Sequence, residues 1–168
     1  MNMRVFIGIK LNDCISEIKS IIENLKVEGG QANYTKLDNI HITLEFLGEI
    51  SVMDIEKIKE IFSFVKQKCF EISLNKITNF KNMIILGVQN NEHLNLLQAR
   101  LNESLKQRGF LLQNRKYFPH VTLARKSNIE IKKDINLICQ VKEIILFSSS
   151  RINNELIYKP LFWKKLED

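Results

Sequence analysis

The sequence of 168 residues lacks the long apolar segments of membrane proteins and secreted precursors. No apolar run approaches the roughly 18 residues needed to span a bilayer. The N-terminal stretch MNMRVFIGIK has too short an apolar run for a signal peptide, and it contains no small-residue cleavage site. No linker or low-complexity segment divides the chain. We therefore expect one two-lobed domain over residues 1–168 that is cytoplasmic, makes no membrane contact and acts as a monomer.

Cysteine is scarce, and its three positions, Cys14, Cys69 and Cys139, are widely spaced. The absence of a Cys-x-x-Cys pair argues against a zinc ribbon or a thioredoxin-type site. We expect the three side chains to be small core hydrophobes in a reducing compartment.

Glycine-rich phosphate-binding motifs are also absent, because the sequence contains neither GxxxxGK[ST] nor GxGxxG. Chemistry driven by ATP or a dinucleotide therefore has no support. The charge balance favours an anionic partner, since 25 Lys and Arg against 19 Asp and Glu give a formal net charge of +6. A nucleotide or RNA would suit this balance, although an excess spread over the surface would serve solubility equally well.

The hydrophobic pattern predicts the element order β-α-β-α-β-β-α-β-β-β. Periodic apolar stripes predict a helix over residues 13–27, a second helix after Ser51, and a third over residues 92–108. The polar residues 127–136 are expected to form a loop, and QVKEIILFSSS is expected to form a single strand. The ends of the helices carry further signals: we expect caps at Asp13 and Ser51, and stops at Gly29-Gly30 and Gly109.

Histidine is scarce as well, yet two of the three histidines open the same tetrad, His-x-Thr-Leu. The first lies in NIHITLEFLG, residues 39–48, and the second in FPHVTLAR, residues 118–125. In each half of the chain a helix leads into such a strand. Two similar lobes facing each other would bring both tetrads to one central cleft.

Within each tetrad, the alternation of a strand places the histidine and the threonine on one face. His41 and Thr43 would share a polar face, and so would His120 and Thr122. One imidazole can be neutral and activate water while the other is protonated and donates to a leaving oxygen. Threonine hydroxyls can donate to phosphate oxygens, and Arg125 can neutralise their charge. This set is suited to opening a phosphodiester.

Other interpretations remain open. Each histidine taken alone could be a structural residue of a strand. A metal site would need a third ligand, and neither an HExxH motif nor an acidic-histidine cluster supplies one. His93, at the start of the third predicted helix, is expected on the surface. We therefore expect no metal and no cofactor.

The paired tetrads resemble the signature of the two-histidine phosphoesterase superfamily, and the whole chain is similar to the RNA 2′,3′-cyclic phosphodiesterases, formerly called 2′-5′ RNA ligases. MRVFIGIKL, NIHITLEFLGEI, FPHVTLAR and EIILFSSS carry the likeness. The resemblance implies a two-lobed, pseudo-symmetric α+β fold, with antiparallel sheets lining a central cleft and helices outside. It also implies metal-independent hydrolysis of an RNA or nucleotide 2′,3′-cyclic phosphate to a 2′-phosphomonoester.

Carried over by motif, His41 is the acid that protonates the departing O3′ and His120 is the base that activates water. The resemblance also assigns the phosphate oxygens to Thr43 and Thr122, and a substrate-binding role to Arg125. Phe46 occupies the same offset in the first motif as Arg125 in the second, and could stack on a base.

Strict alternation would place Phe46 and Arg125 on the opposite strand face from their histidines. A bulge or a bend at the strand end would bring them back. Two alternative functions remain: cleavage or joining of 2′-5′ linkages, and an RNA-binding module without turnover.

Overall fold

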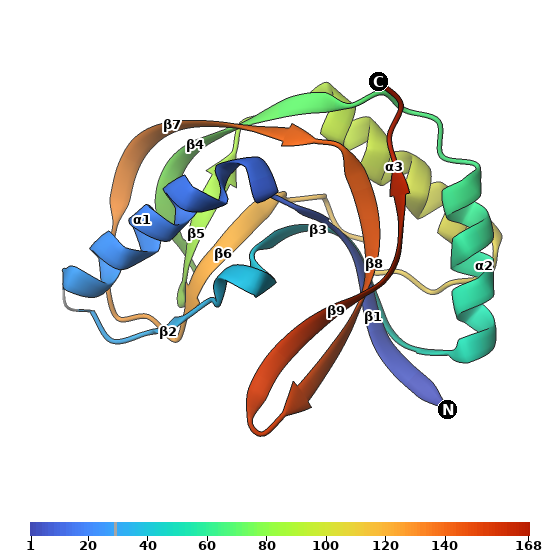
Figure 1. Ribbon diagram of the computed structural model, residues 1–168, viewed down its shortest axis with the longest axis horizontal. Helices are drawn as coiled ribbons and strands as arrows, with labels where there is room; N and C mark the ends of the chain where they lie inside the picture. The colour runs from blue at the N-terminus through green and yellow to red at the C-terminus, as the bar shows by residue number, and fades with distance from the viewer. Residues whose placement is uncertain (29) are drawn as a thin grey trace.

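The computed structural model describes residues 1–28 and 30–168 (Figure 1). The strands are β1 (Asn2–Lys10), β2 (Asn33–Tyr34), β3 (His41–Ser51), β4 (Phe70–Phe80), β5 (Met83–Val88), β6 (His120–Arg125), β7 (Lys132–Val141), β8 (Glu143–Ile152) and β9 (Glu155–Lys165). The helices are α1 (Ile15–Val27), α2 (Val52–Ser63) and α3 (Glu92–Gln107), with short 3-10 turns η1 (Asn12–Cys14) and η2 (Leu37–Asn39). The expected α+β class is confirmed.

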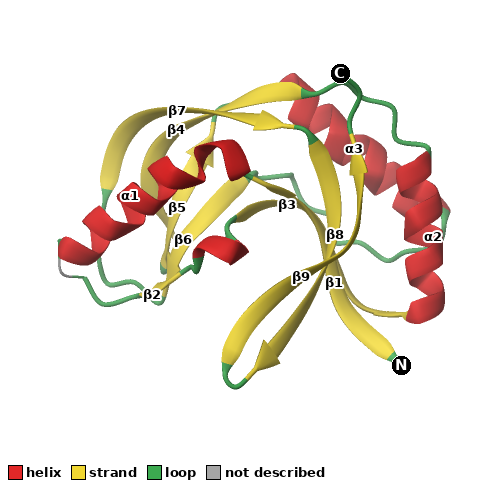
Figure 2. Ribbon diagram, in the orientation of Figure 1, coloured by secondary structure: helices red, strands yellow, loops and turns green. Residues whose placement is uncertain are grey.

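The strands form one antiparallel sheet in the order β7-β4-β5-β6-β3-β1-β8-β9, and β2 pairs with β6. The middle of this sheet is narrow, because β3 and β6 pair through Ile42 and Val121. On either side lie four strands: the β4 half (β7-β4-β5-β6) and the β1 half (β3-β1-β8-β9). Figure 2 shows the two halves as separate groups of strands. The two expected lobes are therefore the halves of one sheet.

The helices cover one side of each half. α1 follows η1, which contacts β7, and Figure 1 shows α1 over the β4 half. α2 and α3 contact each other and β3 in the β1 half. The apolar stripes of all three helices are buried in one main core with the inward side chains of the strands. The opposite face of each half is left free of these helices, and His41 and His120 lie there. Among the described residues, none of the helices has the length and apolar content required to cross a membrane.

The predicted helix ends are largely confirmed. The Ser51 side chain accepts a hydrogen bond from the Asp54 backbone N–H, and α3 ends before Gly109, whose φ is +90°. Gly29 lies outside the described residues. The cap predicted at Asp13 is wrong, because its carboxylate accepts from the Gln140 N–H across to β7.

Two predictions about the last third of the chain are wrong. The expected loop over residues 127–136 becomes β7 from Lys132 onward, because β4 supplies the hydrogen-bonding partner that a polar segment lacks by itself. The expected single strand QVKEIILFSSS breaks at Lys142, since β7 pairs in the β4 half and β8 pairs in the β1 half.

The cysteine prediction requires a correction as well. Cys14 and Cys139 are buried, as expected, but they form a disulfide that joins η1 to β7. The sequence alone could not predict this pair, because the two cysteines are separated by 125 positions and are brought together only by the fold. Cys69 is a free thiol.

Candidate active site

The two tetrads meet where the halves of the sheet join. Ile42 lies directly opposite Val121 in the antiparallel register, and both side chains are fully buried. The residues on either side of each point to the opposite face. That face therefore carries the imidazole and hydroxyl of both tetrads, namely those of His41, Thr43, His120 and Thr122. The structure thus brings all four predicted residues together around the Ile42–Val121 pair.

Both imidazoles are oriented by the same kind of hydrogen bond. His41 Nδ1 lies 2.6 Å from the Asn39 carbonyl oxygen, and His120 Nδ1 lies 2.9 Å from the Phe118 carbonyl oxygen. Because a carbonyl only accepts, Nδ1 carries the proton in each ring and Nε2 is the basic nitrogen of the neutral form. His41 Nε2 lies 3.0 Å from Thr43 Oγ1, so the Thr43 hydroxyl donates to it.

The surroundings disfavour the charged form of both rings. Burial, together with the smaller effects of the Arg125 and His120 charges, lowers the pKa of His41 to about 4. Burial and the Arg125 charge also lower the pKa of His120. In both cases the hydrogen bond to the backbone carbonyl acts in the opposite direction. The free protein therefore holds both imidazoles neutral near pH 7.

Each tetrad strand contains a β-bulge directly after its threonine. In β3 the register to β1 skips Leu44, and in β6 the register to β5 skips Leu123. Two consecutive buried residues follow each threonine as a result, and the next side chain, Phe46 or Arg125, is exposed. A bulge shifts the alternation by one residue. Phe46 and Arg125 thereby return to the face of the histidines.

Contacts agree with this placement. The Phe6 ring lies 4.8 Å from the His41 ring and 5.9 Å from the Phe46 ring, measured between centroids. The guanidinium of Arg125 lies beside β5, with Nη1 3.3 Å from Met83 Sδ, and its charge acts on both histidines. Phe46 is therefore linked to the first imidazole through the Phe6 ring, and Arg125 is near both imidazoles.

Sequence reasoning missed the aromatic side chains that enclose the histidines. Tyr158 meets the His41 ring edge-on at 5.1 Å, and Phe118 stacks on the His120 ring at 5.1 Å. Phe6, Phe147 and Phe80 complete these two groups. The period-2 pattern of the strands identifies such residues as strand-forming, but it carries no signal of which ring reaches a histidine.

Sequence reasoning also missed two hydrogen bonds that join the two halves of the sheet. The Tyr117 hydroxyl donates to the Thr43 carbonyl oxygen, and the Thr35 hydroxyl donates to the Thr122 carbonyl oxygen, each at 2.8 Å. In both cases a residue a few positions before one histidine bonds the threonine of the other tetrad. These bonds hold the two bulged strands in a fixed relative position.

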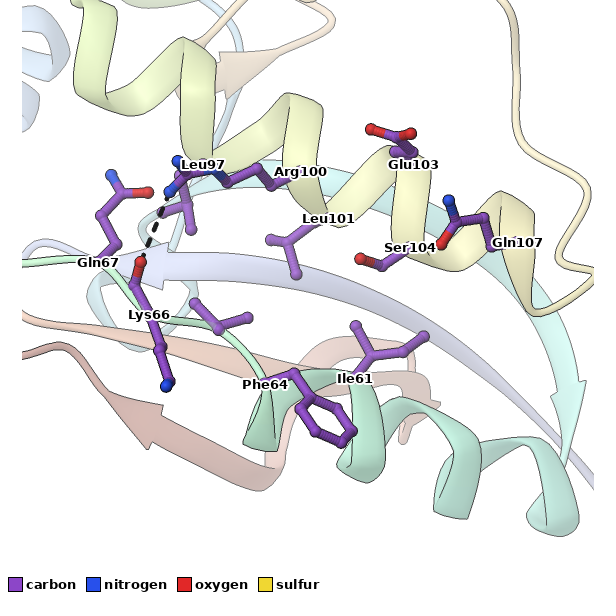
Figure 3. A pocket seen from close by; sticks show the side chains of 11 residues that line it. Ile61, Phe64, Lys66, Gln67, Leu97, Arg100, Leu101, Glu103, Ser104 and Gln107 are labelled. Atoms are coloured by element: carbon purple, nitrogen blue, oxygen red, sulfur yellow. Dashed lines mark hydrogen bonds between the residues drawn. The ribbon is translucent and has the colours of Figure 1, made fainter.

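Two further candidate sites lie elsewhere. In the part of the chain that the structure describes, the group of three side chains close enough to hold a metal ion is Asp13, Cys14 and Cys139, and its cysteines form the disulfide. A cavity of about 480 Å³ lies between α2 and α3, lined by Lys66, Arg100 and other residues (Figure 3). None of the predicted site residues lines it.

His93 is exposed at the start of α3, as expected, and stacks on Phe70. It takes no part in the histidine pair.

Comparison with known proteins shows the family of this chain. The model of the 2′-5′ RNA ligase superfamily matches residues 15–143. The RNA 2′,3′-cyclic phosphodiesterase of Methanocaldococcus jannaschii is 31% identical over 175 residues, which cover 94% of this chain and 97% of that protein. The protein of the same name from Thermotoga maritima is 33% identical over 134 residues, covering 73% and 70% respectively.

A solved structure extends the likeness to the whole fold. Escherichia coli LigT in complex with 3′-AMP superposes on this chain with a TM-score of 0.88 and 25% identity, and the match covers 100% of both chains. The ligand in that complex is a nucleotide with a phosphate at O3′.

Proposed function

The chain belongs to the 2′-5′ RNA ligase superfamily, and from this premise we propose that it hydrolyses terminal RNA 2′,3′-cyclic phosphates to 2′-phosphomonoesters without a metal ion. The observation that carries the proposal is the pair of imidazoles on one face, each with Nδ1 bound to a backbone carbonyl. This leaves two Nε2 atoms for proton transfer. The names of the two curated relatives support the substrate class.

In the proposed reaction, His120 Nε2 takes a proton from water while the water oxygen forms a bond to phosphorus. The bond between phosphorus and O3′ breaks on the opposite side, and His41 gives its proton to the departing O3′. One water is consumed, and exchange with solvent returns each imidazole to its starting form. A positioned acid and a positioned base each contribute about 10²–10⁴ to such a rate.

The charged form of His41 is supplied by substrate binding. In the free protein, burial holds the pKa of His41 at about 4. An anionic phosphate beside the ring favours the imidazolium and raises this pKa. The acid therefore becomes protonated in the complex, where it is needed, rather than in the free protein.

The threonines and Arg125 act on the phosphate oxygens. Thr43 Oγ1 lies 3.0 Å from His41 Nε2, so its hydroxyl can turn to a non-bridging oxygen when the ring becomes protonated. Thr122 occupies the equivalent position in the second tetrad. The Arg125 guanidinium neutralises the charge that builds up at phosphorus. Phe46, which is 53% exposed, offers a ring on which the terminal base can stack.

The proposal is tested by product analysis in the presence of a chelator. The protein is incubated with 2′,3′-cyclic mononucleotides and with RNA that ends in a cyclic phosphate. The expected product carries the phosphate on O2′. A 3′-phosphate product would contradict the leaving group assigned here, and activity that is lost with chelator and restored by zinc would contradict the metal-free mechanism.

A further inference from the structure

The β4 half carries two rows of side chains that run from the tetrad of β6 to the outer strand β7. Residues directly opposite each other in an antiparallel pair point to the same face. The first row is Thr122, Ile85, Thr78 and Lys132. The second row is His120, Gly87, Lys76 and Asp134. Both rows therefore lie on the face that carries His120.

The Lys76 side chain packs over Gly87 in the second row, because glycine has no side chain of its own there. A Cβ atom at Gly87 would lie 3.3 Å from Lys76 Cγ. The aliphatic part of Lys76 therefore lies over Gly87, which is the residue directly opposite His120. A Cβ atom at this position would require the Lys76 side chain to shift by a few tenths of an ångström.

Lysines on this face are available for a ligand. Lys76 and Lys132 are exposed, and within the described residues neither forms an ion pair. Lys81 lies at the end of β4, with Nζ 5.4 Å from the Phe80 ring centroid, and that ring lies 6.1 Å from the His120 ring. Cations therefore lie on this face on both sides of β5, which itself carries none: Arg125 on β6, and Lys76 and Lys132 on β4 and β7.

The path ends in a hollow of about 810 Å³ between the β4–β5 turn and the chain before β7. Thr78, Lys81 and Lys132 line it, together with the acidic Glu130. The second row instead ends on Asp134, which repels an anion. The first row has the buried Ile85 between Thr122 and Thr78, but it is flanked by the exposed Lys76 and ends on Lys132. It is therefore the more favourable route for a chain of phosphates.

Resting on the function proposed above, we propose that this face binds the RNA strand that precedes the cyclic phosphate. The terminal nucleotide occupies the histidine pair, and the preceding phosphates follow the first row past Lys76 toward Lys132. The preferred substrate class is then an RNA of several nucleotides rather than a cyclic mononucleotide. Single-stranded RNA fits because it carries one phosphate per nucleotide and because cationic grooves with exposed rings are the usual means of holding it.

The test measures binding, so that it does not depend on turnover. The probe is a 5′-labelled RNA of about eight nucleotides with a terminal phosphate, and its dissociation constant is measured by fluorescence anisotropy over a range of salt concentrations. Lys132→Gln and Lys76→Gln remove the two lysines in turn. The matched control is Lys133→Gln, because Lys133 is exposed in the same strand but lies opposite the buried Ile77 on the helix-covered face.

Each of the two lysine variants is expected to weaken binding and to reduce the slope of log affinity against log salt by about 0.7, the value for one phosphate contact in single strands. Lys133→Gln should leave the slope unchanged, and Asp134→Asn should tighten binding. Competition by a nucleoside monophosphate should be less sensitive to these changes than binding of the RNA. Equal slopes for Lys132→Gln, Lys76→Gln and Lys133→Gln would overturn the proposal. A protein that binds the RNA in this way but fails to hydrolyse it would overturn only the proposed function.

Discussion

Ile42 of β3 lies directly opposite Val121 of β6, and this pair joins the two halves of the sheet with both side chains fully buried. The same central residue of each tetrad thus anchors the site from below, while the neighbouring histidines and threonines face outward. The tetrads resemble each other because they occupy equivalent positions on the two sides of this pair. Rigid strands rather than loops hold the imidazoles, which suits a site that must fix two proton-transfer groups.

The position of Arg125 predicts a shift in pH dependence. Its positive charge lowers the pKa of His41 and of His120, in addition to the larger effect of burial. Arg125→Gln should therefore raise both pKa values, and both limbs of the profile of kcat/KM should move to higher pH. The wild-type bell should be centred on the acidic side of about 6.5, the usual value for histidine. Arg100→Gln on α3 is the control and should leave the limbs in place. Limbs that move to lower pH in Arg125→Gln would contradict the assigned position of the charge.

Glu45 follows the bulge residue Leu44 in β3. Its buried carboxyl leads us to expect that the stability of the protein depends on pH. Burial raises the pKa of its carboxyl, against the opposing hydrogen bonds from Asn102 and Gln98. A raised folded-state pKa means that the protonated form favours folding, and this stability is lost as pH rises from the unfolded pKa through the folded one. Glu45→Gln keeps an oxygen for both amides and loses the charge. We expect the difference between its melting temperature and that of the wild type to shift in favour of the variant as the pH rises from 4 to 8.

The variant Glu45→Ala provides the comparison. It leaves two amide donors without their acceptor, and an unsatisfied buried group costs about 1–3 kcal/mol. We expect it to be less stable than the wild type at both pH values. If the wild type instead gains stability over Glu45→Gln as the pH rises, the carboxylate is better solvated than its burial implies.

The disulfide predicts a sensitivity to reductant. Cys14 and Cys139 are 125 residues apart, and a disulfide that closes a long loop stabilises a protein by about 2–4 kcal/mol. Denaturant unfolding with and without dithiothreitol should show a loss of this size for the wild type and for Cys69→Ser. Cys14→Ser should be insensitive to reductant. Three reactive thiols in the native, unreduced protein would show that the bond is absent.

The site residues were predictable from the sequence because each tetrad is a local pattern. His41 and Thr43 are two positions apart in a strand, so their shared face follows from alternation alone. A bulge or a bend was the expected way for Phe46 and Arg125 to return to that face, but the choice between the two was not predictable, since a bulge is defined only by the register to a neighbouring strand. The registers of β3 with β1 and of β6 with β5 define the two bulges.

The errors have a common physical cause, which is the contribution of distant partners. β7 is polar and exposed for much of its length, and it becomes a strand because β4 offers it hydrogen bonds. The disulfide and the bonds from Tyr117 and Thr35 also join segments far apart in the sequence. Periodicity reports on which side of an element is buried, but it contains no information about which element lies beside it.

The central claim is that His41 acts as the acid and His120 as the base, and it is tested most directly by changing the leaving group. Turnover of RNA 2′,3′-cyclic phosphate is compared with turnover of a p-nitrophenyl phosphodiester, whose leaving group departs without a proton. On the cyclic phosphate, His41→Ala and His120→Ala should each lose about 10²–10⁴ in rate, and His93→Ala should lose little. On the p-nitrophenyl substrate, His41→Ala should recover most of its rate while His120→Ala stays slow. Recovery of His120→Ala instead would reverse the two roles, and recovery of neither variant would contradict proton transfer by this pair.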